Sequence, residues 1–350
     1  MSNHSGDKHR QHVTGLILLI AAVAVMAAVL ILLGGSEDPE AGTRGATAAD
    51  LGAPLTDSDP ADIGTADTVV WNGVRYRKRP NLQVVLLIGY DKNGETSYGN
   101  RQGGMSDFLV LAVQDDNAET VSLLQIDRDS MTRIPTYDSF GRPGGSKVMQ
   151  ICFSHYWTGS IDQNDLNTKE AVENMLGIRV DDTVSMDFSG IIGINRLVGG
   201  VTVTVRDDMT NVDEAFVRGA EVTLTDSLVI PFVRARMNVG DGSNAGRMAR
   251  QRDYMNAYVA KAEAMAKADA GFVTDLVNGF YDVANFSRPK GWMINEMNKI
   301  YQNDYRISQP VTLGGTSVPG SQSRSGYREF YIDQDELIGW VLSTLYRPMD

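Results

Sequence analysis

Three apolar runs decide the fold: Val84–Ile88 (VVLLI), Phe108–Val113 (FLVLAV) and Val121–Ile126 (VSLLQI). They lack the strict alternation of apolar and polar residues that marks a strand with one solvent-exposed face. Continuous runs of this length are typical of strands that are buried on both faces, in a sheet covered by helices. The sequence therefore predicts an α/β fold with helix–sheet–helix (α-β-α) layers.

The pattern on either side of these runs predicts further elements. Two β-prone segments flank Asn72-Gly73, which is a strong signal for a hairpin over 69–76. Gly199-Gly200 is expected to close a helix. The remaining predicted elements are strands over 183–187, 201–205, 228–236 and 330–332, and helices over 168–176, 189–197 and 245–270.

A stretch near the N-terminus, Gly15–Gly34 (GLILLIAAVAVMAAVLILLG), contains no charged side chain. As a helix it is long enough to span a bilayer core. Lys8 and Arg10 precede it and acidic residues follow it, so the positive-inside rule places residues 1–14 in the cytoplasm. A cleaved signal peptide is the alternative, but the apolar run is longer than such peptides have.

The composition after this stretch changes at residue 35. Residues 35–68 are mostly small and polar and predict a flexible extracellular stalk, because few large apolar side chains are available for a core. We therefore expect a cytoplasmic tail (1–14), a single transmembrane helix (15–34), this stalk, and an extracellular domain (69–350). The protein is expected in the cell membrane, as a single-pass protein whose C-terminal domain lies outside.

Composition excludes several classes of site. The formal net charge of −12 argues against a nucleic-acid-binding surface. The one cysteine, Cys152, excludes a disulfide framework and a cysteine-based zinc site, and we interpret it as a small buried side chain. Only His155 lies outside the N-terminal tail, and we interpret it as structural. Polar chemistry is therefore expected from carboxylates, arginines, lysines and an oxygen-bound metal ion.

One segment, Val233–Arg252 (VRARMNVGDGSNAGRMARQR), holds five arginines and one acidic residue. Guanidinium groups match phosphate oxygens. The first two arginines are two apart on a predicted strand and point to one face, and the later polar residues share one face of a helix. The expected anion ligands are Arg234, Arg236, Asn244 (as the helix N-cap), Arg247, Arg250 and Gln251. Ordinary salt bridges with the abundant acidic residues are the alternative.

Charged residues also flank the predicted strands. Asp91 follows the first run, Asp107 precedes the second and Arg128 follows the third. Ligands of open α/β sheets gather outside the carboxyl ends of strands. Carboxylates combined with phosphate oxygens and water suit Mg²⁺, although turn or capping roles are the alternative for both aspartates. Lys147, in a Gly-rich loop, is either a further positive contact or a solvent-exposed side chain.

The order of these segments resembles the LytR-CpsA-Psr family. The segments are LLIGYD, MSDFLVL, LLQIDRDSM, SK, GIIGINRLVGGVTVTV and FVRARMNVGDGSNAGRMARQR, within residues 82–262. The resemblance implies a central mixed sheet, and the predicted anchor and stalk agree with it. The chain departs from the family's pattern at Met105, where many members have Arg, and at Asn244, where many have Asp.

The resemblance implies an activity outside the membrane. Family members resemble phosphotransferases that move a glycopolymer from a polyprenyl (undecaprenyl) pyrophosphate onto peptidoglycan as a phosphodiester. The resemblance implies that Asp91 and Asp107 bind Mg²⁺ (or Mn²⁺), and that an apolar tunnel holds the lipid tail. Candidates for its lining are Phe188, Ile191, Ile192 and Ile194, which are apolar at near-helical spacing, but ordinary core packing is the preferred interpretation of each. The arginines implied at the pyrophosphate are Arg128, Arg234, Arg236 and Arg247, with Gln251 beside them; Lys147, Asn244 and Arg250 are added from their positions.

The catalytic residues expected are Asp91, Arg128, Arg236 and Arg247, with Asp91 the preferred general base. Two alternatives stay open: a polyprenyl-pyrophosphate phosphatase, and a non-catalytic cell-wall-anchoring or regulatory module. The partners expected are the carrier-linked glycopolymer, peptidoglycan and the membrane, and not a nucleic acid.

Overall fold

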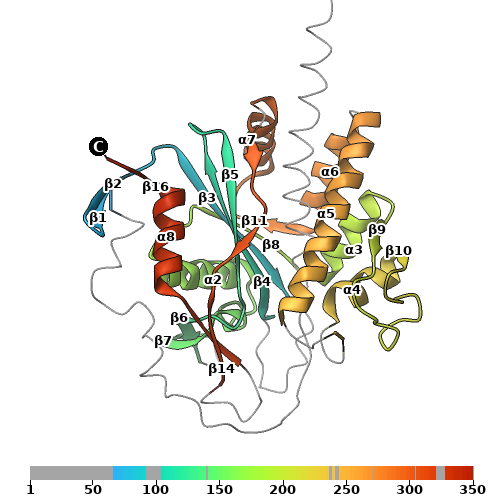
Figure 1. The fold of residues 1–350 in the computed structure, drawn as a ribbon, viewed down its shortest axis with the longest axis horizontal. Helices are drawn as coiled ribbons and strands as arrows, with labels where there is room; N and C mark the ends of the chain where they lie inside the picture. The colour runs from blue at the N-terminus through green and yellow to red at the C-terminus, as the bar shows by residue number, and fades with distance from the viewer. Residues whose placement is uncertain are drawn as a thin grey trace, which may run out of the picture. The chain divides into compact units, whose positions relative to one another are not determined.

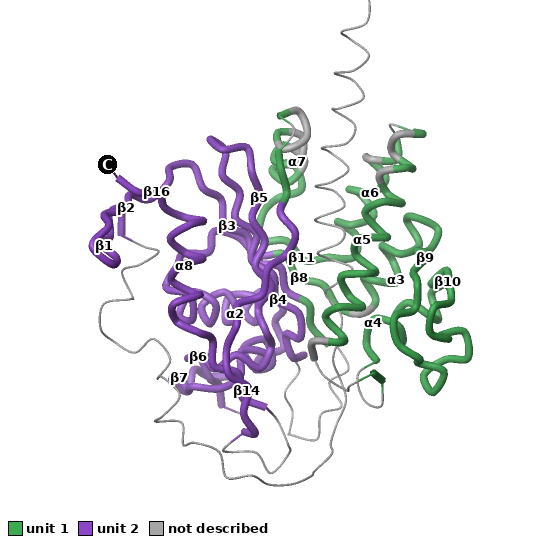
Figure 2. Tube along the Cα trace, viewed as in Figure 1, with its two compact units in different colours: residues 1–33, 89–91, 184–307 green, residues 34–88, 92–183, 308–350 purple. Residues whose placement is uncertain are grey.

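The computed structural model describes residues 66–91, 104–138, 141–235, 239–240, 244–269, 271–303, 305–320 and 328–349. These residues fall into two compact units (Figure 2). Of the described residues, unit 1 contains those within 89–91 and 184–307, and unit 2 contains those within 66–88, 104–183 and 308–349.

The sheet of unit 2 contains the three apolar runs (Figure 1). It is part of a seven-stranded sheet, whose strands that begin in unit 2 include β3 (Leu82–Tyr90, which enters unit 1 at Gly89), β4 (Ser106–Asp115), β5 (Thr120–Ile126) and β13 (Val311–Thr312). β3 lies beside β4, β4 pairs antiparallel with β5, and β13 pairs parallel with β5. The sheet is therefore mixed, as predicted.

Helices α2 (Ile161–Leu176) and α8 (Gln334–Leu345) cover one face of this sheet (Figure 1). Leu86, Leu111 and Leu124 of the strands form one buried cluster with apolar side chains of both helices. Side chains of the opposite face, such as Val110 and Leu123, are also buried. Both faces are thus shielded from water, which confirms the prediction from the continuous apolar runs.

Smaller elements complete unit 2. The predicted hairpin is present, because Trp71 pairs with Val74 around Asn72 (φ 51°) and Gly73 (φ 78°), both in the left-handed region that this tight turn requires. The remaining elements are β1 (Thr68–Trp71), β2 (Val74–Lys78), β6 (Met131–Tyr137), β7 (Pro143–Gln150), the 3₁₀ helix η3 (Ile151–His155), β14 (Gly315–Pro319), β15 (Arg328–Ile332) and β16 (Tyr346–Pro348).

Unit 1 contains the predicted strand–helix–strand sequence. β8 (Asp182–Met186) starts in unit 2, α3 (Phe188–Leu197) is capped by Asp187, whose carboxylate accepts the Ser189 N–H, and β9 (Val201–Thr204) follows. The predicted long helix is α5 (Asn244–Ala268). The other elements are β10 (Glu221–Leu224), α6 (Phe272–Tyr281), β11 (Ala284–Phe286), α7 (Lys290–Gln302) and β12 (Arg306–Ile307).

The strand predicted over 228–236 is wrong, because this segment forms helix α4 (Asp226–Arg234). Val229, Phe232 and Val233 are buried at helical spacing, and the helix packs against α3 and α5. A short apolar run does not distinguish a buried strand from a buried helix. Pro231 was the signal against an interior strand, since it lacks the N–H that a ladder needs.

None of the helices in the described part of the chain is both long and apolar enough to cross a bilayer. The predicted tail and transmembrane helix, and the stalk as far as residue 65, lie outside the described residues. The membrane anchor therefore stays a prediction.

Candidate functional site

Arg128 is the centre of a buried charged cluster in unit 2. It lies two residues beyond the end of β5, and its Nη1 is 2.9 Å from Oδ1 of Asp107, the second residue of β4. Its Nε is 3.5 Å from Oδ1 of Asp129. Burial disfavours the charge of Arg128, but the attraction of Asp107, with smaller contributions from Cys152 and Asp129, raises its pKa above the ordinary value. The guanidinium is therefore permanently charged.

Two sulfur atoms contact the other end of the guanidinium. Nη2 of Arg128 lies 3.4 Å from Sγ of Cys152 and 3.6 Å from Sδ of Met105. Burial raises the pKa of the Cys152 thiol to about 12, although Arg128 acts in the opposite direction. The thiol is therefore protonated at neutral pH and is a poor nucleophile, because the thiolate is the reactive form.

His155, at the end of η3, is a buried histidine with partners on both sides. Its Nε2 is 2.9 Å from Oδ1 of Asp165 on α2, and its Nδ1 is 3.2 Å from the carbonyl oxygen of Gly104. With 1% of its surface exposed, the ring is enclosed within unit 2. The structural interpretation of His155 made from the sequence is consistent with these contacts.

The two predicted metal ligands lie in different units. Asp91 follows β3 directly and is buried in unit 1, whereas Asp107 belongs to unit 2. Within the described ranges, no three side chains of His, Cys, Asp or Glu lie together as a metal-binding group. A site with only one or two carboxylates still suits Mg²⁺, because waters and phosphate oxygens supply the rest of its ligands. Lys147 is a solvent-exposed residue of β7, opposite Ile134.

In unit 1, the expected helical face of α5 is buried. Arg247, Arg250 and Gln251 are each at most 3% exposed. Arg250 donates to Oδ2 of Asp207 at 3.2 Å and to the carbonyl of Ala235, the residue after Arg234. The contact with Ala235 joins the C-terminal end of α4 to α5.

Some expected ligands lie on a different element from the one predicted, or outside the described residues. Arg234 is the last residue of helix α4, so the argument that Arg234 and Arg236 point to one face of a strand does not apply. Arg236 and the side chain of Asn244 lie outside the described residues. Asn244 is the first residue of α5 rather than the residue before it.

The sequence did not reveal the partners that hold Arg128 and Arg250. Asp129 was adjacent to Arg128 and offered a weak signal. Met105 and Cys152 precede and follow Arg128 by 23 and 24 residues, and Asp207 precedes Arg250 by 43 residues. No spacing rule connects such distant positions.

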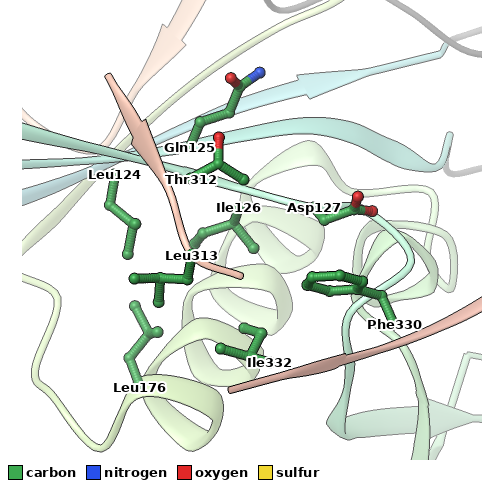
Figure 3. Close-up of a pocket in the computed structure, with 9 residues that line it drawn as sticks. All are labelled: Leu124, Gln125, Ile126, Asp127, Leu176, Thr312, Leu313, Phe330 and Ile332. Atoms are coloured by element: carbon green, nitrogen blue, oxygen red, sulfur yellow. The ribbon is translucent and has the colours of Figure 1, made fainter. Parts of the chain in front are cut away.

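The apolar residues offered for a lipid tunnel are packed in unit 1. Ile191 and Ile194 of α3 are fully buried, and Ile192 is partly buried. A pocket of about 220 Å³ lies instead in unit 2 (Figure 3). Its lining is mostly apolar, from β5, α2 and the C-terminal strands, with Asp127 at one end.

Comparison with known proteins identifies the family. The model of the LytR_cpsA_psr family matches residues 55–332. The polyisoprenyl-teichoic acid–peptidoglycan teichoic acid transferase TagV of Bacillus subtilis (strain 168) is 30% identical over 177 residues, which are 48% of this chain and 42% of that protein. The transferase TagU of Bacillus anthracis (strain CDC 684 / NRRL 3495) is 23% identical over 248 residues, 71% of this chain and 73% of that protein.

Solved structures share the fold. The crystal structure of B. subtilis TagV aligns with a TM-score of 0.54 at 19% identity, over 77% of this chain and 98% of that one. The structure titled "TagT bound to LI-WTA" aligns with a TM-score of 0.54 at 20% identity, over 75% and 90%. Because the family model covers well over half of the sequence, and the mixed α/β fold agrees, the chain belongs to the LytR_cpsA_psr family.

Proposed function

We propose that this protein is a phosphotransferase that moves a glycopolymer from a polyprenyl pyrophosphate carrier onto peptidoglycan as a phosphodiester. The observation that carries the proposal is the buried Arg128, held between Asp107 and Asp129. The family membership and the names of its relatives, which are teichoic acid transferases, support the same substrate class.

Arg128 suits a diphosphate ligand because the three nitrogen atoms of its guanidinium group have partners of different hydrogen-bonding strength. Its Nη1 and Nε face carboxylates, whereas among the described residues its Nη2 contacts the sulfur atoms of Met105 and Cys152. Sulfur is a weak hydrogen-bond acceptor. The Nη2 donors therefore lose little by turning to a phosphate oxygen. The further proposed ligands of the pyrophosphate are Lys147, Arg234, Arg236, Asn244, Arg247, Arg250 and Gln251.

In the proposed reaction, a sugar hydroxyl of peptidoglycan attacks the phosphorus that carries the glycopolymer. The bond from this phosphorus to the bridging oxygen breaks, polyprenyl phosphate leaves, and the hydroxyl proton passes to a carboxylate, for which we propose Asp91. Fixed guanidinium groups stabilise the negative charge that develops on the transferred group and the leaving oxygen. Arg128, Arg236 and Arg247 are proposed for this task.

Asp91 and Asp107 are proposed to hold Mg²⁺ (or Mn²⁺), which when bound supplies positive charge beside the diphosphate. The carboxylate of Asp107 is buried, and its Oδ1 lies 2.9 Å from Nη1 of Arg128. We further propose that residues 15–34 anchor the chain with its C-terminal domain outside the membrane, where both the carrier and the acceptor are found.

The test uses the full chain in lipid nanodiscs, a radiolabelled glycan on polyprenyl pyrophosphate, Mg²⁺ and peptidoglycan. We expect label in the peptidoglycan, and its loss in Arg128→Ala at unchanged far-UV circular dichroism. Released glycan phosphate that never joins peptidoglycan identifies a phosphatase instead. Binding without any turnover, whichever metal is supplied, identifies a non-catalytic module.

A further inference from the structure

The 3₁₀ helix η3 contacts the polypeptide on both sides of the Asp107–Arg128 ion pair. The Cys152 N–H donates to the carbonyl of Arg128 at 3.1 Å, and Sγ of Cys152 lies against the guanidinium of the same residue. The Ser106 hydroxyl lies 3.4 Å from the carbonyl oxygens of Ile151 and Cys152. One turn of helix therefore holds both the backbone of Arg128 and the residue before Asp107.

His155 connects η3 to two further segments. A carbonyl oxygen only accepts hydrogen bonds, so Nδ1 carries the hydrogen that it donates to Gly104, three residues before Asp107. The other nitrogen, Nε2, lies 2.9 Å from Oδ1 of the Asp165 carboxyl group. The side chains of His155 and Asp165 are 1% and 3% exposed. Helix α2, through Asp165 and His155, thus holds the segment that leads into β4.

From these contacts we propose that η3 is a positioning element for the candidate site, and that the His155–Asp165 pair locks it against α2. The inference rests on the proposed function, since it assigns positioning residues to the Arg128 site. His155 and Asp165 are not expected to contact substrate. They act by keeping the guanidinium of Arg128 and the carboxylate of Asp107 at the observed separation.

The chain contains a matched control on the same two elements. The Ser154 hydroxyl donates to Oγ1 of Thr168 at 2.9 Å, so this bond also joins η3 to α2 between fully buried residues. It has no connection to Gly104. Loss of a buried hydrogen bond is therefore common to Ser154→Ala and His155→Phe, and only His155→Phe releases the segment before Asp107.

Cys152 provides the probe, because it is the only cysteine of the chain and touches Arg128 directly. The full chain in nanodiscs is treated with iodoacetamide under native conditions, and the alkylation rate is measured by mass spectrometry. We expect His155→Phe to react about tenfold faster than wild type, because the Gly104 carbonyl and the Asp165 carboxyl group lose their contacts with the ring nitrogens of His155. His155→Gln, whose amide still donates to Gly104, recovers part of the protection, and Ser154→Ala stays within about threefold of wild type.

The transfer assay supplies the second readout. We expect kcat/KM to fall about tenfold in His155→Phe and less in His155→Gln, with little change in Ser154→Ala. If His155→Phe fails to fold, Asp165→Ala, which removes the carboxyl group that joins α2 to His155, takes its place in both measurements.

Equal alkylation rates for His155→Phe and Ser154→Ala overturn the proposal. Faster alkylation with unchanged kcat/KM, in a preparation whose wild type transfers, overturns it as well. If the wild type shows no transfer, the proposed function fails separately, and the alkylation rates alone decide whether His155 locks η3.

Discussion

Replacing Asp107 by asparagine removes one charge from the buried ion pair while almost preserving its shape. The N···O distance to Arg128 is 2.9 Å, and the two side chains are only 1% and 7% exposed. At this distance, with an effective dielectric constant of about 20, the Coulomb energy is about 6 kcal/mol. Breaking a buried pair costs about 3–5 kcal/mol, because the remaining charge stays buried.

Asp129 moderates this loss, since its carboxylate is 3.5 Å from Nε of Arg128 and stays in place. We therefore expect Asp107→Asn to lower the free energy of unfolding by about 3 kcal/mol, at the lower end of that range. The measurement is equilibrium unfolding of the full chain in urea, followed by intrinsic fluorescence.

Asp138→Asn is the control, because Asp138 pairs with Arg142 at a similar distance of 2.8 Å on the surface. These side chains are 37% and 73% exposed, and exposed pairs contribute about 0–1 kcal/mol. If the two variants lose the same free energy, burial is not the source of the Asp107–Arg128 energy and the reasoning is refuted.

Four further predictions concern single positions. Arg128→Lys keeps the positive charge but loses the planar, two-pronged arrangement of guanidinium donors. We therefore expect the transfer rate to fall about 100-fold in the nanodisc assay while the far-UV circular dichroism stays unchanged. Full activity would contradict a phosphate-binding role. The pKa of Cys152 is raised from 9.0 to about 12 in the folded protein, so the thiol of the unfolded chain ionises first and stability is lost as the pH rises through this window. In unfolding titrations above pH 9, the free energy of unfolding of Cys152→Ala is expected to fall less steeply with pH than that of the wild type. Gly73→Ala places a Cβ at a φ of 78° and should cost about 1 kcal/mol in thermal unfolding. Arg250→Ala removes the ion pair between Arg250 and Asp207 and should lower the free energy of unfolding by about 2–4 kcal/mol in the same assay. An unchanged free energy of unfolding would contradict a structural role for this pair.

The local features of the fold could be predicted because neighbouring residues determine them. The continuous apolar runs predicted strands shielded on both faces, and β4 is buried along its whole length. Asn72-Gly73 predicted a tight hairpin, because these residues tolerate positive φ. The spacing of Arg247, Arg250 and Gln251 predicted one helical face, and α5 buries all three.

Prediction failed where two local structures satisfied the same pattern. The apolar run of α4 allows a strand or a helix, and packing against α3 and α5 decided for the helix. The error moved Arg234 from a strand end to a helix C-terminus. The direction of a side chain depends on whether its residue lies in a strand or a helix, so the predicted common face of Arg234 and Arg236 did not hold for a helix.

The sequence by itself determined the family, the strands of the central sheet and the residue types that suit a diphosphate, since these depend on short-range pattern and on motif order. Only the tertiary structure decided which groups surround Arg128: a carboxylate from β4, a carboxylate from the adjacent residue, and two sulfur atoms, one of them from η3. It also decided that His155 joins α2 to the segment before Asp107. The physical reason is that these partners belong to different elements, and the distance between their side chains is set by how the core packs and not by their separation along the chain.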